Sequence, residues 1–133
     1  MISRPCLTLT EIDHIMAAAR IAAQKDGLAV TICILDDGGH LLRLDRLEGA
    51  PLISLRVAEG KARTAVELNM SSASLEQAVS ATPSMIAIAG LHPFRGGIPL
   101  YHEGYCVGAI GVSGALPEQD EHVALSGAGA LTA

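Results

Sequence analysis

Half of the glycines of this chain lie in one stretch, residues 89–114, and that stretch restricts the fold more than any other. Its apolar residues come in short runs interrupted by Gly or Pro, a pattern typical of strands and turns. We expect strands over 98–103 and 106–113, joined by a hairpin turn in which Gly104 takes a positive φ. Gly108 and Gly111 leave the second strand with little side-chain bulk. This indicates close approach by a ligand or another backbone, or else a twisted strand under a tightly packed helix.

The N-terminal third predicts one helix followed by one hairpin. Thr8 and Glu11 have the spacing of a capping box, so a helix is expected to begin there and to end at Gly27. The continuous apolar run over 28–35 is typical of a central strand, and the segment over 40–46 alternates between apolar and charged residues. Between them lies an Asp-Asp-Gly-Gly turn signal, which favours a hairpin.

The rest of the chain predicts more helices than strands. Because hairpins connect the strands, we expect an antiparallel sheet with helices packed on it, an α+β fold, and a single domain over residues 1–133. The remaining expected elements are helices over 51–68, 71–80 and 117–131, an apolar connector or strand over 85–89, and a short strand over 91–94.

The composition excludes several classes of function. A net charge of −5 and the absence of Trp argue against nucleic acid as the partner, since no basic patch or stacking platform is indicated. The three cysteines are widely spaced and signal neither a zinc site nor a disulfide framework. No signal-peptide pattern or membrane-spanning run is present, so we expect a cytoplasmic protein without a membrane partner. Half of the residues are hydrophobic, which favours further buried surface between subunits of a homo-oligomer.

Lys61 is the most informative charged residue of the expected second helix. Arg56, Glu59, Arg63 and Glu67 form a charged stripe on this helix, and Lys61 lies roughly opposite them, among apolar positions. A lysine on such a face must extend to solvent, pair with a carboxylate, or contact an anionic ligand. The sequence leaves a ligand site and a structural salt bridge open.

Two further charged groups flank the glycine-rich strands. Arg95 precedes a Gly-Gly pair, where its guanidinium is suited either to binding a carboxylate or to bonding a neighbouring carbonyl. Glu118, Asp120 and Glu121 crowd the first turn of the last helix, where acids favour the helix dipole. Alternatively, Glu118 or Asp120 faces the glycine-rich strand, as a general base or as the partner of Lys61. The candidate catalytic residues are Lys61, Arg95, Glu118 and Asp120, and the candidate ligand contacts are Gly96, Gly97, Gly111 and Ser113.

The five histidines show no metal-binding spacing. Each alone is more typical of an ordinary surface or core residue than of an iron ligand. His14, His92 and His102 are the candidates for an iron ligand.

Several motifs resemble the GlcG/HbpS family, which includes the haem-binding C-terminal domain of PduO-type proteins. They are R-G-G-I-P-L-Y, V-G-A-I-G-V-S-G and P-E-Q-D-E near the C-terminus, D-D-G-G-H-L over 36–41, and A-E-G-K-A-R-T-A over 58–65. The resemblance spans nearly the whole chain. It implies a five-stranded antiparallel sheet of the profilin or PAS-like kind, assembly into larger oligomers, and haem as the one cofactor to expect. Haem requires an axial ligand and a flat apolar pocket. The candidate haem ligands are then His14, His92 and His102.

Two functions from different classes follow. The first is binding of a small ligand, with haem as the leading candidate, by a protein accessory to a catabolic pathway. The second is a cofactor-free enzyme, a deaminase, hydrolase or isomerase, acting on a small anionic carboxylated metabolite. In this enzyme Arg95 would anchor the carboxylate, Lys61 would polarise the substrate or form an imine, and Glu118 or Asp120 would move the proton. A purely structural subunit of a larger assembly is the third alternative.

Overall fold

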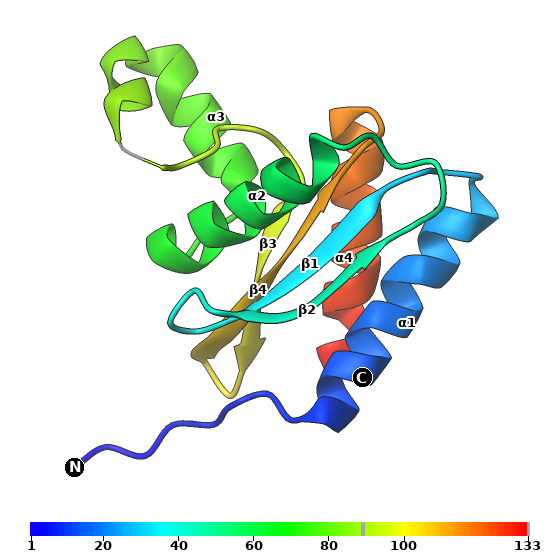
Figure 1. Cartoon of the computed structure of the whole chain (residues 1–133). Helices are drawn as coiled ribbons and strands as arrows, with labels where there is room; N and C mark the ends of the chain where they lie inside the picture. Colours follow the sequence, from blue (N-terminus) through cyan, green and yellow to red (C-terminus); the bar gives the residue numbers. More distant parts are fainter. Residues whose placement is uncertain (89, 133) are drawn as a thin grey trace.

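A four-stranded antiparallel sheet forms the centre of the molecule (Figure 1). The computed structural model describes residues 1–88 and 90–132, and the strand order is β2-β1-β4-β3. The elements are α1 (Leu9–Lys25), β1 (Thr31–Asp36), β2 (Leu41–Arg46), α2 (Ser54–Leu68), α3 (Ser72–Ala81), the 3-10 helix η1 (Pro83–Ala87), β3 (Gly97–His102), β4 (Tyr105–Ser113) and α4 (Pro117–Thr132). The expected α+β class and antiparallel sheet are confirmed.

Helices cover both faces of the sheet. Alternate residues of β1 divide between the two faces, so that Ile32 and Ile34 pack with α1 and α4 while Cys33 and Leu35 pack with α2. The α1 and α4 side holds the larger apolar core. Figure 1 shows α3 and η1 as an arm that extends from the end of α2, away from the sheet.

The predicted capping box forms at the start of α1. The backbone N–H of Thr8 donates to Glu11 Oε2 at 2.7 Å, and the two side chains are also in contact. Gly27 follows the helix with a φ of 64°, as a helix-terminating glycine does. The hairpin turn between β3 and β4 also matches its prediction, because Glu103 and Gly104 both have positive φ.

Helix α2 lies directly on the glycines of the sheet. A Cβ atom on Gly111 would lie 2.0 Å from the carbonyl oxygen of Ala58, and one on Gly97 would lie 2.1 Å from that of Lys61. The helix contributes Ala58, Ala62 and Ala65 to this contact, which keeps the two backbones close. The low bulk of β4 therefore accommodates a tightly packed helix, one of the alternatives left open by the sequence.

The expectation of five strands is wrong, since the described residues form four. The segment 91–94, expected as a strand, is not part of the sheet. Pro93 has no N–H, and the N–H of His92 donates to Thr64 Oγ1 on α2 at 2.7 Å. The N–H of Phe94 turns back to the carbonyl oxygen of His92 at 2.9 Å. Helix α2 and a local turn thus use the donors that a sheet would need.

Two further points concern the segment 85–89 and whether any helix could cross a membrane. The connector or strand expected over 85–89 begins within η1, and residue 89 lies outside the described residues. None of the helices in the described part of the chain is long and apolar enough to cross a membrane.

Candidate functional site

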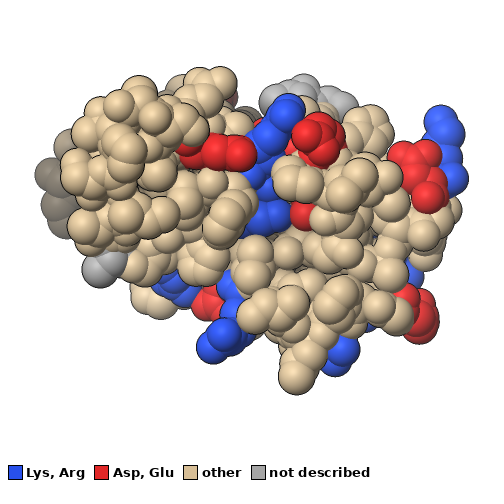
Figure 2. All heavy atoms as spheres, turned by 90° about the horizontal axis from the view of Figure 1, so that it is seen from above, with Lys and Arg blue, Asp and Glu red and all other residues tan. Residues whose placement is uncertain are grey.

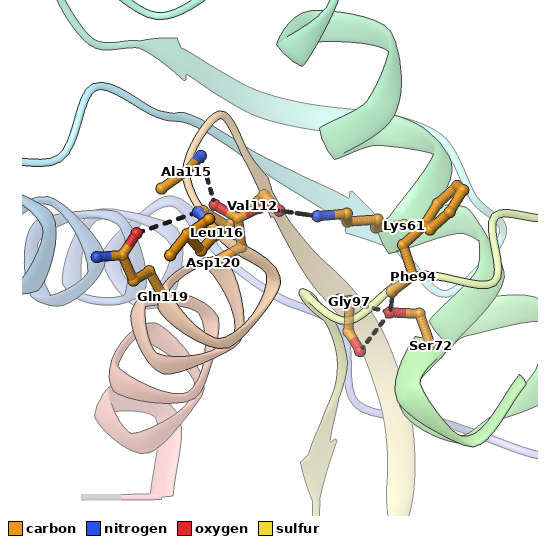
Figure 3. Close-up of polar contacts among 9 residues, drawn as sticks. All are labelled: Lys61, Ser72, Phe94, Gly97, Val112, Ala115, Leu116, Gln119 and Asp120. Carbon is orange, nitrogen blue, oxygen red and sulfur yellow. Dashed lines mark hydrogen bonds and ion pairs between the residues drawn. The ribbon is translucent and has the colours of Figure 1, made fainter. Parts of the chain in front are cut away.

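Lys61 and Asp120 form a buried ion pair between α2 and α4 (Figure 3). Lys61 Nζ donates to Asp120 Oδ2 at 3.0 Å and to the carbonyl oxygen of Val112 at 2.9 Å. The two side chains are 4% and 3% exposed. Asp120 Oδ1 accepts the N–H of Ala115 at 3.0 Å, so this carboxylate also fixes the turn between β4 and α4.

The surroundings of this pair leave little space for another molecule. A Cβ on Gly96 would lie 2.9 Å from Lys61 Nζ and 2.6 Å from the carbonyl oxygen of Val112. Ser113, at the end of β4, is buried with 8% exposure. The contacts therefore support a salt bridge, one of the alternatives left open for Lys61. Action of either ionic group on a ligand would require the pair to open, and their catalytic role stays a prediction, as does ligand contact by Gly96, Gly97, Gly111 and Ser113.

Ser72 organises the adjacent turn, a role that no sequence pattern indicated. Its Oγ accepts the N–H of Gly97 at 2.8 Å and donates to the carbonyl oxygen of Phe94 (Figure 3). The turn over 94–97 is thereby attached to the first residue of α3. A serine at the start of a helix signals only a cap, so no pattern in the sequence predicts this longer-range contact.

Arg95 contacts the acids in the first turns of α4. Its Nη2 donates to Glu121 Oε1 at 2.8 Å, whereas Nη1 is 3.9 Å from Glu118 Oε1. The hydrogen bond and the charge of Glu121 raise the pKa of Arg95. Glu121 is thus the nearer partner, although the sequence drew attention to Glu118 and Asp120. Arg95 and Glu121 line a hollow of about 620 Å³ between α3 and α4.

The three candidate haem ligands lie in different surroundings. His14 is exposed on α1, and the side chain of His102 is 52% exposed, with Nε2 3.8 Å from a carboxylate oxygen of Glu103. His92 is half-buried, and its Nδ1 is buried with no hydrogen-bond partner among the described residues. His92 and His102 each line a hollow with apolar side chains, but the hollow beside His102 has a volume of about 160 Å³ and the one beside His92 about 510 Å³.

The hollow beside His92 lies over the N-terminal half of α2. It has a volume of about 510 Å³ and is lined by Ile53, Arg56, Val57, His92 and Phe94. A hollow lined also by Leu52 and Leu55 adjoins it, since both share Ile53 and Arg56. Ile53 and Phe94 are 53% and 50% exposed, so an apolar face is open here. Arg56 forms no ion pair with any described residue.

The His92 ring is held against α2 at a glycine. A Cβ on Gly60 would lie 2.3 Å from both Nδ1 and Cε1 of this ring, so the position admits no larger residue without moving the histidine. The rings of His92 and Phe94 are 6.5 Å apart in an edge-on arrangement. Within the described residues, no group of three or more His, Cys, Asp or Glu side chains could hold a metal ion.

The fold and sequence place the chain in a known family. Residues 7–129 match the family described as haem-degrading protein HbpS-like, and the chain belongs to that family. It is 36% identical over 100 residues to the protein GlcG of Escherichia coli, an alignment that covers 74% of this chain and 75% of GlcG. The resemblance found in the sequence is thereby confirmed.

Two solved structures are closely similar. A double mutant of HbpS from Streptomyces reticuli has a TM-score of 0.91 and 34% identity, with 98% of this chain and 90% of that chain covered. A complex of PduOC with haem has a TM-score of 0.88 and 27% identity, with 95% of each chain covered.

Proposed function

We propose that this protein binds haem over the N-terminal half of α2, with His92 as the iron ligand. The observation that carries the proposal is the imidazole of His92, which lines an open apolar hollow and forms no side-chain hydrogen bond with another described residue. Its Nδ1 is buried against Gly60 of α2, so the other ring nitrogen, Nε2, would bind the iron. The haem complex of PduOC, a protein of the same fold, supports this choice of ligand.

The residues of the hollow fit the chemistry of haem. Ile53, Val57 and Phe94 offer apolar surface to a flat macrocycle, and the imidazole of His92 offers the axial nitrogen. Arg56, which has no ion pair with another described residue, is placed to bind a propionate. The volume of about 510 Å³ lies in the range of small-molecule sites. Bound haem would supply a redox-active iron.

A hemin titration followed by visible absorption tests the proposal. We expect a saturable shift of the Soret band with the unmodified chain, and loss of that shift with His92→Ala. His14→Ala and His102→Ala are matched controls that should titrate like the unmodified chain. A non-saturating response of the unmodified chain, or loss of the shift in either control alone, would overturn the assignment.

We infer three further properties from composition and exposure. Self-association as a homo-oligomer would cover apolar side chains such as Leu9 and Ile21 of α1, which are 69% and 66% exposed. Three free cysteines suit a reducing cytoplasm. A role accessory to a catabolic pathway rests on the family resemblance alone. Light scattering during size-exclusion chromatography tests the first, and a monomer at all concentrations would contradict it.

A further inference from the structure

Another hollow, distinct from the two that share Ile53 and Arg56, lies between α3 and α4. It has a volume of about 620 Å³ and shares no lining residue with the hollow over α2. Figure 2 shows this face of the molecule, where basic and acidic atoms meet between two lobes. The polar side chains that line it include Glu76, Gln77 and Ser80 of α3, Arg95, and Glu121 of α4.

The guanidinium of Arg95, at the wall of this hollow, has more hydrogen-bond donors than acceptors to receive them. A guanidinium has five N–H donors, and a single hydrogen bond, to Glu121 at 2.8 Å, is formed within the described part of the chain. Its Nε is buried and has no acceptor there. Because an unpaired buried donor is costly, the site favours a ligand with an oxygen acceptor that engages this guanidinium, with adjustment of its side chain.

The carboxylates of the hollow favour a positively charged group on the ligand. Glu76 forms no hydrogen bond or ion pair within 4.0 Å in the described residues, yet its charge contributes to raising the pKa of Arg95. Two carboxylates and one guanidinium line the hollow, so its lining has one net negative charge. A simple anion would be repelled by the carboxylates, and a simple amine would leave the guanidinium unmatched.

We propose that the hollow between α3 and α4 binds a small zwitterion with a protonated amine and a carboxylate, of the amino-acid type. The carboxylate binds the free N–H groups of Arg95, and the amine binds Glu76. Gln77 and Ser80, which are exposed at the hollow, are available to a hydroxyl or amide on the ligand. This inference does not depend on haem binding, since the two hollows are lined by different residues.

Isothermal titration of the unmodified chain with matched probes tests the inference. The probes are γ-aminobutyrate and β-alanine, with butyrate as the carboxylate alone and n-butylamine as the amine alone. We expect one of the two amino acids to bind saturably, and at least about tenfold more tightly than butyrate or n-butylamine, since it forms both ionic contacts.

Two variants assign the contacts, and a third is the control. Glu76→Gln and Arg95→Gln should each weaken binding of the amino acid by about tenfold or more. Glu67→Gln, an exposed glutamate of α2 that lines neither hollow, should leave it unchanged. Far-ultraviolet circular dichroism and thermal unfolding of each variant verify that the rest of the chain is intact.

Three results would overturn the inference. They are the absence of saturable binding by both amino acids, equally tight binding of butyrate or n-butylamine, and undiminished binding in Glu76→Gln and Arg95→Gln.

Discussion

At the residue scale, the buried pair of Lys61 and Asp120 shows what an ionic contact can contribute to this fold. Removal of two charges from water is costly, and their attraction offsets that cost only when geometry and further hydrogen bonds are good. Here Lys61 also donates to Val112 and Asp120 also accepts from Ala115, so each group has a second partner. The pair therefore joins α2, the end of β4 and the start of α4.

Removal of one partner should destabilise the chain strongly. Lys61→Met leaves the Asp120 carboxylate buried and uncompensated, so we expect the free energy of unfolding to fall by about 3–5 kcal/mol. Urea denaturation followed by circular dichroism measures this. The matched control is Arg43→Met, which removes a surface pair to Asp13 at 2.8 Å and should cost below about 1 kcal/mol. Similar losses in the two variants would contradict the account.

Cys33 should make stability depend on alkaline pH. Burial, followed by the charge of Glu59, raises the pKa of its thiol from 9.0 to about 12. The folded chain keeps this proton where the unfolded chain releases it, so the contribution of Cys33 is complete below about pH 9 and is lost as the pH rises towards about 12. Unfolding free energies measured across that window should fall more steeply for the unmodified chain than for Cys33→Ala. Parallel curves would show that Cys33 contributes nothing to the slope.

At the element scale, α2 links the sheet to the proposed haem site. One side of the helix packs through Ala58, Ala62 and Ala65 on the sheet, while Gly60 receives the ring of His92. The contact is close because Gly97 and Gly111 present no side chain. The position of His92 therefore depends on a glycine in the middle of a helix, where glycine is otherwise unfavourable by about 1 kcal/mol.

Substitution of that glycine should weaken haem binding without direct contact to haem. A methyl group in Gly60→Ala would overlap the imidazole, so the ring must move, and we expect hemin affinity to fall by about tenfold or more. Gly129→Ala is the matched control, because a Cβ on this helical glycine would meet no described atom within 4 Å beyond the adjacent residues and its own helix backbone. Soret titrations of the two variants measure the difference. Equal hemin affinities of the two variants would show that the position of His92 does not affect haem binding.

At the scale of the whole molecule, local signals predicted most of the elements but not the strand count. The capping box, the turn glycines and the apolar runs act over a few residues, and the structure confirms the helices and hairpins that they predict, although α2 begins at Ser54 and not at Pro51. The segment 91–94 was wrongly expected as a strand, because its pairing is decided by Thr64, which is distant in the sequence. Short apolar runs do not by themselves specify a strand.

The candidate sites show the same division between local sequence signals and contacts that depend on the whole fold. Helical periodicity placed Lys61 on an inward face, but nothing local distinguished a ligand from Asp120 as its partner. The choice of Glu121 for Arg95, and of Ser72 for the turn at Gly97, depends on how α3 and α4 lie across the sheet. Such contacts require the complete fold.

Hydrogen–deuterium exchange of the chain with and without bound hemin tests the central claim most directly. We expect slower amide exchange in residues 54–60 and 91–95, the segments around the hollow of Ile53, His92 and Phe94. Exchange around His14 and around His102 should stay unchanged. Protection confined to either of those histidines, with a saturated Soret band, would contradict the proposed site.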